Sequence, residues 1–395
     1  MTAHSGEVGD EPLLLMTPGP TRVPERVLRA GARQMIHHRT PEFSRELAVA
    51  LELLGPVFGT TEKPLPIHTT GRGALEAAIC NLFSPGDEIA VCCNGKFGEM
   101  WARLAESYGV VARRVATRWE LGVDTSELES TLDDHPRVRA IALAFGDSST
   151  GVANDVEAIA RIAWSRGGDK LVLVDGVSSI GGMPFAFDAW GVDVAVTASQ
   201  KCLMSAPGLS WAVLSDRAWS ACESSTLPRS YWDLGAVKRA VGKARPETPG
   251  TPPVAIVLQV AEALRMIHEE GLDTVYARHA ALARRVRDGI HELGLSLQCP
   301  ELPRLSATMT AIALPAEIEP RALRERIKAR GILSAGGLGP FESLGFRIGH
   351  MGDIRLADVD RTLDALRHSL DEVRAEAPGA RSRDARSGRG EAVAS

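Results

Sequence analysis

The 395-residue sequence predicts an α/β protein with a large domain built on a mostly parallel sheet, followed by a smaller α+β domain. Between residues 65 and 215, helical patterns alternate with short continuous runs of Val, Ile and Leu. Such runs are typical of parallel strands that helices cover on both faces. After residue 255, a long helical stretch leads into only two further strand patterns, which indicates a smaller second domain.

The elements of the large domain follow one another in order. Helical patterns are "GALEAAICNLF", "FGEMWARLAESYG" and the segments near 125–133 and 155–166. Strand patterns are "EIAVCCNG", "VVARRVAT", "VRAIALAFGD", "KLVLVDG", "VDVAVTAS" and "LSWAVLSD". The helices repeat apolar residues every three or four positions, whereas the strands are short, apolar and rich in β-branched residues.

In the second domain, "ATMTAIALP" and "FRIGH" predict strands, and "PRALRERIKARG" and "LADVDRTLDALRHSLDEVRAEA" predict helices. We therefore predict an N-terminal arm (1–20), a large domain (21–270), a small domain (271–375) and a tail (376–395). The tail is poor in apolar residues and rich in Arg, Gly and Ser, which predicts disorder.

Composition excludes several classes of protein. The net charge of −5 gives no support for nucleic acid or an anionic membrane as the partner. No apolar run approaches the roughly 20 residues that cross a bilayer, and the polar start "MTAHSGEVGDEP" is no secretory signal. Six cysteines are too few for a disulfide scaffold, and none has zinc-site spacing. We expect a cytoplasmic protein without a metal.

The segment "HTTGRGALEAA" predicts an anion site at the start of a helix. Thr70 is a good N-cap, and Gly71 and Gly73 let backbone N–H groups face a ligand. Arg72 in the first turn opposes the helix dipole, and a bound phosphate would reverse that effect. A glycine-rich loop with an outward arginine explains the segment equally well, and it matches neither GxGxxG nor a Walker loop.

Two strand-like runs each end in one ionisable residue, Asp175 in "LVLVDGVSSIGG" and Lys201 in "TASQKCL". Ligands of open α/β sheets bind at the carboxyl ends of strands. There, a lysine can form an imine with an aldehyde and a carboxylate can hold a proton on a ring nitrogen, while Phe97 in "NGKFGEMW" can stack on a ring. Taken singly, a turn cap, a surface lysine and a core aromatic are the plainer explanations. With the anion site, the set matches what pyridoxal phosphate requires.

A series of motifs gives the chain a family resemblance. They are "TPGPT", "GALEAAICNLFSPGD", "NGKFGEMW", "SSTGV", "VDGVSSIGG", "SQK", "TPPV" and "GGLGP…FRIGHMG", in that order. The chain resembles fold-type I pyridoxal-phosphate enzymes of the class V aminotransferase family, nearest to the alanine–glyoxylate and serine–pyruvate or serine–glyoxylate group. The resemblance covers nearly the whole chain apart from its two ends.

The resemblance implies a role for particular residues. Lys201 matches the lysine that binds the cofactor aldehyde, and Asp175 matches the acid at the pyridine nitrogen. Phe97 and Val177 match the two residues that pack on opposite ring faces. The remaining cofactor contacts that it implies are Thr70, Gly71, Arg72 and Gln200 at the phosphate, Ser148 at the ring hydroxyl and Thr251 at the phosphate of a neighbouring subunit.

The resemblance also implies substrates and assembly. Arg347 in "FRIGH" matches the arginine that binds the substrate α-carboxylate through a planar fork. The implied reaction moves an amino group from a small amino acid, of alanine or serine type, to a 2-oxo acid such as glyoxylate or pyruvate. The implied assembly is a homodimer, for which the N-terminal "PLLLMTPGPT" segment could also lie across the partner.

Other reactions on the same scaffold are the main alternative, including lyases and specialised biosynthetic aminotransferases. A cysteine desulfurase needs a nucleophilic cysteine on a mobile loop, and Cys299 in "SLQCPEL" has no glycine-rich surroundings. A non-catalytic paralogue that only binds pyridoxal phosphate is a less favoured alternative, because Lys201, Asp175 and Arg347 are all present.

Two residues depart from the family pattern. Thr248 stands where some relatives have a phosphate-binding tyrosine, and Arg72 stands where several have histidine. His37 and His38 could line the entrance, although adjacent histidines point in different directions and make a poor metal site. His350 could face the same cavity or make a structural hydrogen bond, and Trp232 could wall the site or simply pack.

Overall fold

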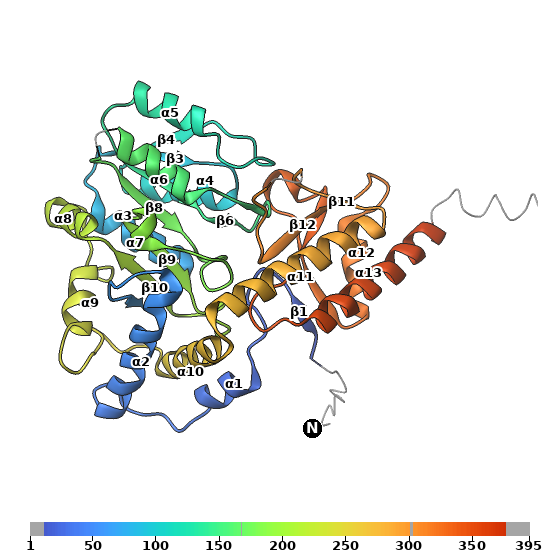
Figure 1. Cartoon of the computed structure of the whole chain (residues 1–395), viewed down its shortest axis with the longest axis horizontal. Helices are drawn as coiled ribbons and strands as arrows, with labels where there is room; N and C mark the ends of the chain where they lie inside the picture. Colours follow the sequence, from blue (N-terminus) through green and yellow to red (C-terminus); the bar gives the residue numbers. More distant parts are fainter. Residues whose placement is uncertain (1–11, 167, 301–302, 377–395) are drawn as a thin grey trace, which may run out of the picture.

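The computed structural model describes residues 12–166, 168–300 and 303–376, and the predicted tail lies outside this range except for its first residue. Figure 1 shows two bodies side by side, a large one (blue to yellow) and a smaller one (orange to red). Each body has its own buried apolar cluster. In the described part of the chain, none of the helices has the length and hydropathy needed to cross a bilayer.

The large domain is built on a seven-stranded sheet in the order β2-β10-β9-β8-β5-β3-β4. Only β10 runs antiparallel to its neighbours, so the prediction of a mostly parallel sheet is confirmed. The strands are β2 (Leu65–Ile67), β3 (Glu88–Cys92), β4 (Val111–Val115), β5 (Val138–Ala144), β8 (Leu171–Asp175), β9 (Val194–Ala198) and β10 (Ser210–Leu214). Their continuous burial explains why their sequences show apolar runs rather than alternation.

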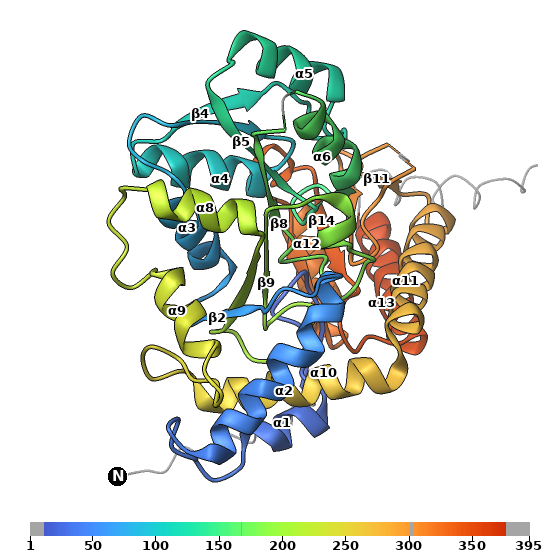
Figure 2. The ribbon, with the colours of Figure 1, turned by 60° about the vertical axis from the view of Figure 1, so that its left-hand side comes forward.

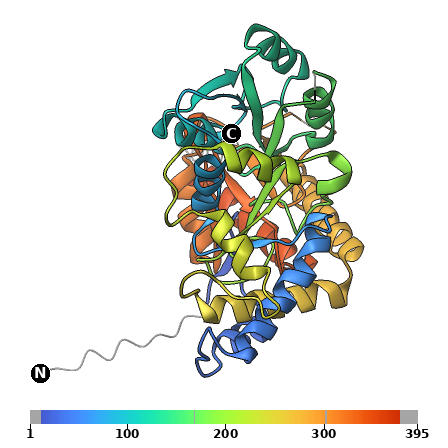
Figure 3. The same ribbon diagram turned by 90° about the vertical axis from the view of Figure 1, so that its left-hand side faces the viewer.

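Helices cover both faces of this sheet, with α3 and α4 on one side and α6 on the other (Figures 2 and 3). The helices are α1 (Glu25–Gly31), α2 (Pro41–Phe58), α3 (Gly71–Leu82), α4 (Lys96–Ser107), α5 (Thr125–Asp134), α6 (Val156–Ser165), α7 (Phe187–Trp190), α8 (Asp216–Ser224), α9 (Leu234–Val241) and α10 (Val254–Glu270). A small hairpin, β6 (Gly146–Asp147) with β7 (Val152–Ala153), projects after β5.

The long helical stretch breaks at Gly271, whose φ of +86° ends α10, and most of the smaller body is built from the elements that follow. The sheet of this small domain has the order β1-β13-β14-β12-β11. The strands are β1 (Leu14–Met16), β11 (Ser296–Leu297), β12 (Met309–Ala313), β13 (Ile332–Gly336) and β14 (Gly345–Gly349). The helices are α11 (Leu272–Glu292), α12 (Pro320–Ala329), η1 (Gly339–Phe341) and α13 (Leu356–Glu376).

The N-terminal strand belongs to the small domain. Leu14–Met16 pairs in parallel with Ile332–Ser334, so the first described strand forms the edge of the sheet built by the last third of the chain. This segment lies against its own chain, and its extended sequence therefore gives no support for a dimer. Residues 17–24 then lead from the small domain back to α1 of the large domain.

Candidate active site

Asp175 is the last residue of β8, at the carboxyl end of the parallel strands. Its side chain is 5% exposed, and the described residues donate one hydrogen bond to it, from the Val177 N–H to Oδ1 at 2.9 Å. The pKa of Asp175 is raised to about 7, mainly by burial and also by the nearby Asp147, against the opposing effects of the Val177 hydrogen bond and of Lys201. A buried carboxylate with so few donors is suited to a cationic or N–H partner that a ligand would bring.

Lys201 lies on the same side, three residues after β9 ends at Ala198. Its Nζ donates a hydrogen bond to the carbonyl oxygen of Pro18, and none of the described carboxylates forms an ion pair with it. Burial lowers the pKa of Lys201, and Arg347 lowers it further, while Asp175 opposes this shift. An amine with a lowered pKa is more often neutral, which is the form that attacks an aldehyde.

The predicted anion site lies at the start of α3. Thr70 is the N-cap, but its side chain makes no capping hydrogen bond. The first N–H groups of a helix, here those of Gly71 and Arg72, have no intrahelical partner. A Cβ on Gly71 would lie 2.7 Å from Val177, so only glycine lets this turn approach the residues that follow β8.

Gln200 and Arg72 add polar groups whose partners are missing. The Oε1 of Gln200 is buried and has no hydrogen-bond partner among the described residues. Arg72 is exposed and makes no ion pair with any described residue. The free helix N-terminus and Arg72 both present N–H donors and fit a phosphate, whereas the Oε1 of Gln200 is an acceptor and fits an N–H or O–H donor.

Phe97 is the second residue of α4, and its backbone N–H donates to Oδ2 of Asp147 at 3.0 Å. Asp147 is fully buried and also accepts from the backbone N–H of Ser149 at 2.8 Å and from its hydroxyl at 2.5 Å. A Cβ on Gly95 would collide with this carboxylate. Asp147 thus fixes the turn from which Phe97 projects.

Asp147 was not among the residues singled out from the sequence. In "GDSSTG" it reads as an ordinary turn aspartate, because such residues commonly cap turns. The available signal was its position after an apolar strand run, the same signal that drew attention to Asp175. Burial raises the pKa of Asp147, while its hydrogen bonds with Ser149 and Phe97 oppose that shift.

Arg347 reaches this region from β14 of the small domain and is 9% exposed. Its Nε donates to the carbonyl oxygen of Gly336 at 2.7 Å, and Nη1 donates to that of Ser148 at 2.6 Å. Burial lowers the pKa of Arg347 to about 10, and Asp147 opposes this shift. Nη2 has no hydrogen bond with the described residues, and the Ser148 hydroxyl also lacks one. A buried cation held only by carbonyl oxygens favours an anionic ligand.

Thr251 lies on the surface of the single chain, in the segment that precedes α10. Arg39 ties this segment to the large domain, because its Nη1 contacts Glu247 at 3.2 Å and the carbonyl of Thr248 at 2.8 Å. Thr248 is buried, and its hydroxyl donates to the carbonyl of Gly250 at 2.7 Å. Within this chain, the Thr248 side chain therefore stabilises the loop to which it belongs.

The other histidines predicted near the site have structural partners. His37 accepts the backbone N–H of Arg39 at 3.1 Å, and its ring lies 4.6 Å from that of His38. His350 is buried and its Nε2 lies 2.9 Å from the Thr310 hydroxyl, which is the structural hydrogen bond considered from the sequence. Burial lowers the pKa of His350 to about 3. Throughout the described ranges, no group of three or more His, Cys, Asp or Glu side chains is arranged to hold a metal ion.

Two further residues from the sequence analysis are packed in place. Trp232 lies over the first turn of α3, where a Cβ on Gly73 would meet its ring at 2.9 Å. Cys299 is buried, and its thiol donates to the carbonyl of Thr150 at 2.9 Å. Burial raises the pKa of Cys299 to about 12, which keeps the thiol protonated and unreactive.

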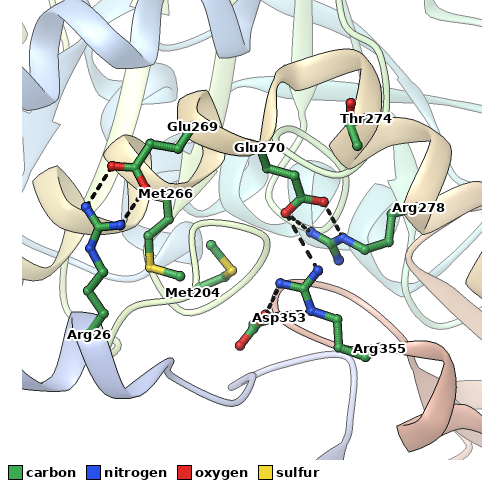
Figure 4. A pocket seen from close by; sticks show the side chains of 9 residues that line it. All are labelled: Arg26, Met204, Met266, Glu269, Glu270, Thr274, Arg278, Asp353 and Arg355. Atoms are coloured by element: carbon green, nitrogen blue, oxygen red, sulfur yellow. Dashed lines mark hydrogen bonds and ion pairs between the residues drawn. The ribbon is translucent and has the colours of Figure 1, made fainter.

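A cavity of about 610 Å³ lies where α1, the α10–α11 junction and the segment before α13 meet. Figure 4 shows its polar lining as ion pairs: Arg26 contacts Glu269, Arg278 contacts Glu270, and Arg355 contacts Asp353. Met204 and Met266 supply the apolar part of the lining. Because each of these arginines already has a carboxylate partner, this junction cavity lacks the unpaired cations of the other site.

Together the described residues around Lys201 provide a buried amine with a lowered pKa, a buried carboxylate without a cation and a helix N-terminus without a side-chain cap, and this donor set fits pyridoxal phosphate. The fold and the site therefore define a pyridoxal-phosphate enzyme of fold type I.

Comparison with known proteins gives the family. The model of the family described as aminotransferase class-V matches residues 14–349, so the chain belongs to the class V aminotransferases and is a transaminase. The resemblance recognised in the sequence is thereby confirmed.

Individual relatives cover almost the whole chain. The small subunit of a soluble hydrogenase from Synechococcus sp. (strain PCC 6716) is 36% identical over 363 residues, which cover 91% of this chain and 93% of that protein. An L-aspartate–glyoxylate aminotransferase from Paracoccus denitrificans (strain Pd 1222) is 36% identical over 345 residues, 86% of each chain. The crystal structure of an alanine–glyoxylate aminotransferase from Nostoc sp. superposes with a TM-score of 0.87 at 29% identity, covering 93% of this chain and 98% of that one.

Proposed function

We propose that this aminotransferase takes its amino group from a small α-amino acid, of alanine or serine type, and passes it to a 2-oxo acid such as glyoxylate or pyruvate. The observation that carries the proposal is Arg347, a buried guanidinium with two carbonyl partners and an Nη2 left without a hydrogen bond among the described residues. A substrate α-carboxylate would neutralise this charge and accept two parallel N–H bonds. The alanine–glyoxylate and L-aspartate–glyoxylate aminotransferases both have glyoxylate in their names and differ in the donor, which supports the acceptor more firmly than the donor.

The proposed roles follow from the chemistry of each side chain. Bound pyridoxal phosphate supplies an electrophilic aldehyde and a protonated ring that accepts electron density from the substrate. Asp175 holds the proton on the pyridine nitrogen, because the buried carboxylate is stabilised by that cation. Phe97 and Val177 hold the ring between them. Thr70, Gly71, Arg72 and Gln200 bind the phosphate, and the Ser148 hydroxyl approaches the ring hydroxyl.

Lys201 and Arg347 act on the substrate. Arg347 fixes the α-carboxylate and thereby the direction of the Cα–H bond. The Lys201 amine, whose pKa is lowered by burial, removes the proton from Cα as a general base and later returns a proton as an acid. One well-placed group can both remove the Cα proton and return a proton, and the Lys201 amine is suited to that role.

A donor and acceptor panel tests the proposal. The purified protein with pyridoxal phosphate is incubated with alanine, serine or aspartate and glyoxylate, or with serine, aspartate or glycine and pyruvate, and the new glycine or alanine is measured. We expect turnover with alanine or serine, and much slower turnover with the matching amines that lack a carboxylate. Equal rates for an amino acid and its decarboxylated amine would contradict the role of Arg347.

We further propose a homodimer in which Thr251 reaches the phosphate site of the other subunit. Thr251 is exposed, and two large apolar side chains of the same domain are also exposed, with Tyr231 at 69% and Met35 at 65%. Mixed dimers of Lys201→Ala and Thr251→Glu subunits test this arrangement. If the sites are shared, mixing two nearly inactive variants restores activity, because one site in each mixed dimer has both native residues. Activity that never exceeds the sum of the two variants would count against shared sites.

A cytoplasmic location remains a proposal. All six cysteines are free and buried, which suits a reducing compartment. Fractionation of the native cells with an antibody to the protein would check it.

A further inference from the structure

The segment Thr17–Thr21, "TPGPT", crosses from one domain to the other directly over Lys201. It begins after β1 at the edge of the small-domain sheet and ends before α1 of the large domain. We refer to these five residues as the lysine clamp. The chemistry described above uses Lys201 but gives no role to this segment.

The clamp contacts the side chain of Lys201 in two ways. The carbonyl oxygen of Pro18 accepts the hydrogen bond from Nζ. Gly19 has a φ of +102°, and a Cβ at this position would lie 2.5 Å from Cδ, 2.8 Å from Cε and 2.6 Å from Nζ of the lysine. The positive φ favours glycine here, and a Cβ at this position would displace the end of the lysine side chain.

The clamp also holds the backbone beside the lysine. The Thr21 N–H donates to the carbonyl oxygen of Gln200 at 3.1 Å, and the Thr21 hydroxyl donates to that of Lys201 at 3.0 Å. Thr21 is 4% exposed, so these bonds are shielded from water. The backbone of Lys201 and its amine are thus both bound by the same short segment.

At its other end the clamp rests on the strand that carries Arg347. A Cβ on Gly349, two residues beyond Arg347 in β14, would collide with the carbonyl of Thr17 and lie 2.6 Å from the Pro18 nitrogen. The clamp is also stiffened internally, because the Thr17 hydroxyl donates to the carbonyl of Pro20 at 2.8 Å. A continuous series of contacts therefore joins Arg347 in one domain to Lys201 in the other.

We propose that the lysine clamp is a positioning element for Lys201. The clamp fixes the position of the amine through the Pro18 carbonyl, and it links that position to the strand that carries Arg347. This inference rests on the proposed role of Lys201. It assigns Pro18, Gly19 and Thr21 to the placement of the proton-carrying amine rather than to binding of the substrate. Misplacing a reacting group by about 1 Å can slow a reaction by roughly 10²-fold.

The main test compares Gly19→Ala with Gly86→Ala. Gly86 has a similar φ of +86°, but a Cβ added there would meet nothing within 4 Å, so both variants strain the backbone while only Gly19→Ala displaces Lys201. We expect Gly19→Ala to lower kcat by roughly ten- to a hundredfold relative to Gly86→Ala, with KM for the amino acid within about threefold. In the cofactor-free protein, acetic anhydride should label Lys201 faster in Gly19→Ala, as measured by peptide mass spectrometry.

A second pair of variants applies if Gly19→Ala does not fold. Thr21→Val removes the bond to the Lys201 carbonyl, and Thr21→Ser retains the hydroxyl. We expect Thr21→Val to lower kcat severalfold and Thr21→Ser to restore it, because the hydrogen bond rather than the side-chain volume positions the lysine. Identical labelling and kcat for Gly19→Ala and Gly86→Ala, or for Thr21→Val and Thr21→Ser, would overturn the clamp.

These outcomes are separable from failure of the proposed function. If borohydride reduction of the native enzyme fixes pyridoxal phosphate to a lysine other than Lys201, the role of Lys201 is wrong. If it fixes the cofactor to Lys201 but the clamp variants behave like their controls, only the positioning inference is wrong.

Discussion

The site around Lys201 and the junction cavity in Figure 4 both contain charged side chains, which, among the described residues, form ion pairs at the junction but not at the site. At the junction, Arg278 contacts Glu270 at 2.6 Å and the carbonyls of Gly352 and Ile354 at 2.8 and 3.3 Å. At the site, Asp175 and Arg347 are more deeply buried and have no ion pair with the described residues.

The difference indicates which charges stabilise the fold and which await a ligand. A paired arginine beside solvent adds modestly to stability. A buried charge without a partner destabilises the free protein, and its retention suggests that a ligand supplies the missing partner. The variants below test this distinction, from the largest expected effect to the smallest.

The largest effect is expected for Lys201→Ala. Removing the amine removes both the covalent attachment of the cofactor and the proton carrier, so kcat should fall by at least roughly 10³-fold. Borohydride reduction followed by peptide mass spectrometry should find no pyridoxyl group on the chain. If the cofactor of Lys201→Ala is attached to another lysine and turnover is unchanged, Lys201 is neither the attachment point nor the proton carrier.

Asp175→Asn should lower kcat by about two orders of magnitude or more, because a neutral amide cannot hold the ring proton. Some cofactor should still bind, since the phosphate contacts remain. Steady-state kinetics and the visible absorption of the bound cofactor check both statements. Turnover near that of the native enzyme would reduce Asp175 to a cap for the turn at Val177.

The same residue predicts a pH dependence of stability. Its folded pKa of about 7 lies above the ordinary value for aspartate, so between these two values the unfolded chain ionises while the folded chain keeps its proton. The cofactor-free protein should therefore lose stability as the pH rises from about 4 to about 7, by an amount on the order of 4 kcal/mol.

Denaturant unfolding of the cofactor-free protein at several pH values measures this loss. Asp175→Asn should be the more stable form at about pH 8, because it has no charge to bury. Added pyridoxal phosphate should stabilise the native protein more at about pH 8 than at about pH 5, since the ring cation becomes the missing partner. Parallel pH curves for the native protein and Asp175→Asn would rule out this contribution.

Arg347→Lys should lower kcat/KM for amino acids by roughly ten- to a hundredfold, because an ammonium group lacks the planar fork. The absorption of the bound cofactor should stay unchanged. Amines without a carboxylate should be affected far less, and this contrast is the measurement that matters. Equal slowing of both kinds of donor would mean that Arg347 only ties Gly336 to Ser148.

The smallest catalytic effect is expected at the junction cavity. Arg278→Gln removes the pair with Glu270 in a partly buried setting and should lower the free energy of unfolding by about 1–3 kcal/mol. The value of kcat/KM should change by less than about threefold. The more exposed Arg26→Gln provides the matched control and should lower the free energy of unfolding less than Arg278→Gln does. A fall in kcat/KM of more than about threefold for Arg278→Gln would contradict the view that the charges at the junction cavity only stabilise the fold.

Much of the fold was predictable because long apolar runs carry their own signal. The strand before Asp175 and the one before Lys201 are buried on both faces, and their valines report that directly. The role of β1 was not predictable, because three residues form no periodic pattern and their partner begins at Ile332. The break of the long helix falls at Gly271, where the φ of +86° favours glycine.

The candidate site was predictable in part for a similar reason. Asp175 and Lys201 follow strong strand signals, whereas Asp147 sits in a turn whose polar residues look unremarkable. Gly19 and Lys201 are far apart in the chain but in contact in space, and a local sequence pattern cannot predict such a contact. The assigned roles of these residues stay predictions until the variants are measured.

The pairing of Leu14–Met16 with Ile332–Ser334 also affects how the protein is made. Domains usually fold in order of synthesis from the N-terminus. Here the first described strand must wait for β13, so the large domain can collapse early while the edge of the small-domain sheet is completed only after residues 332–336 have been synthesised. A fragment starting at residue 271 would lack that edge strand, and removing the first twenty residues would damage the domain farthest away in sequence. The stretch over Lys201 would then reach its place only after β13 has been synthesised, more than a hundred residues after Lys201 itself.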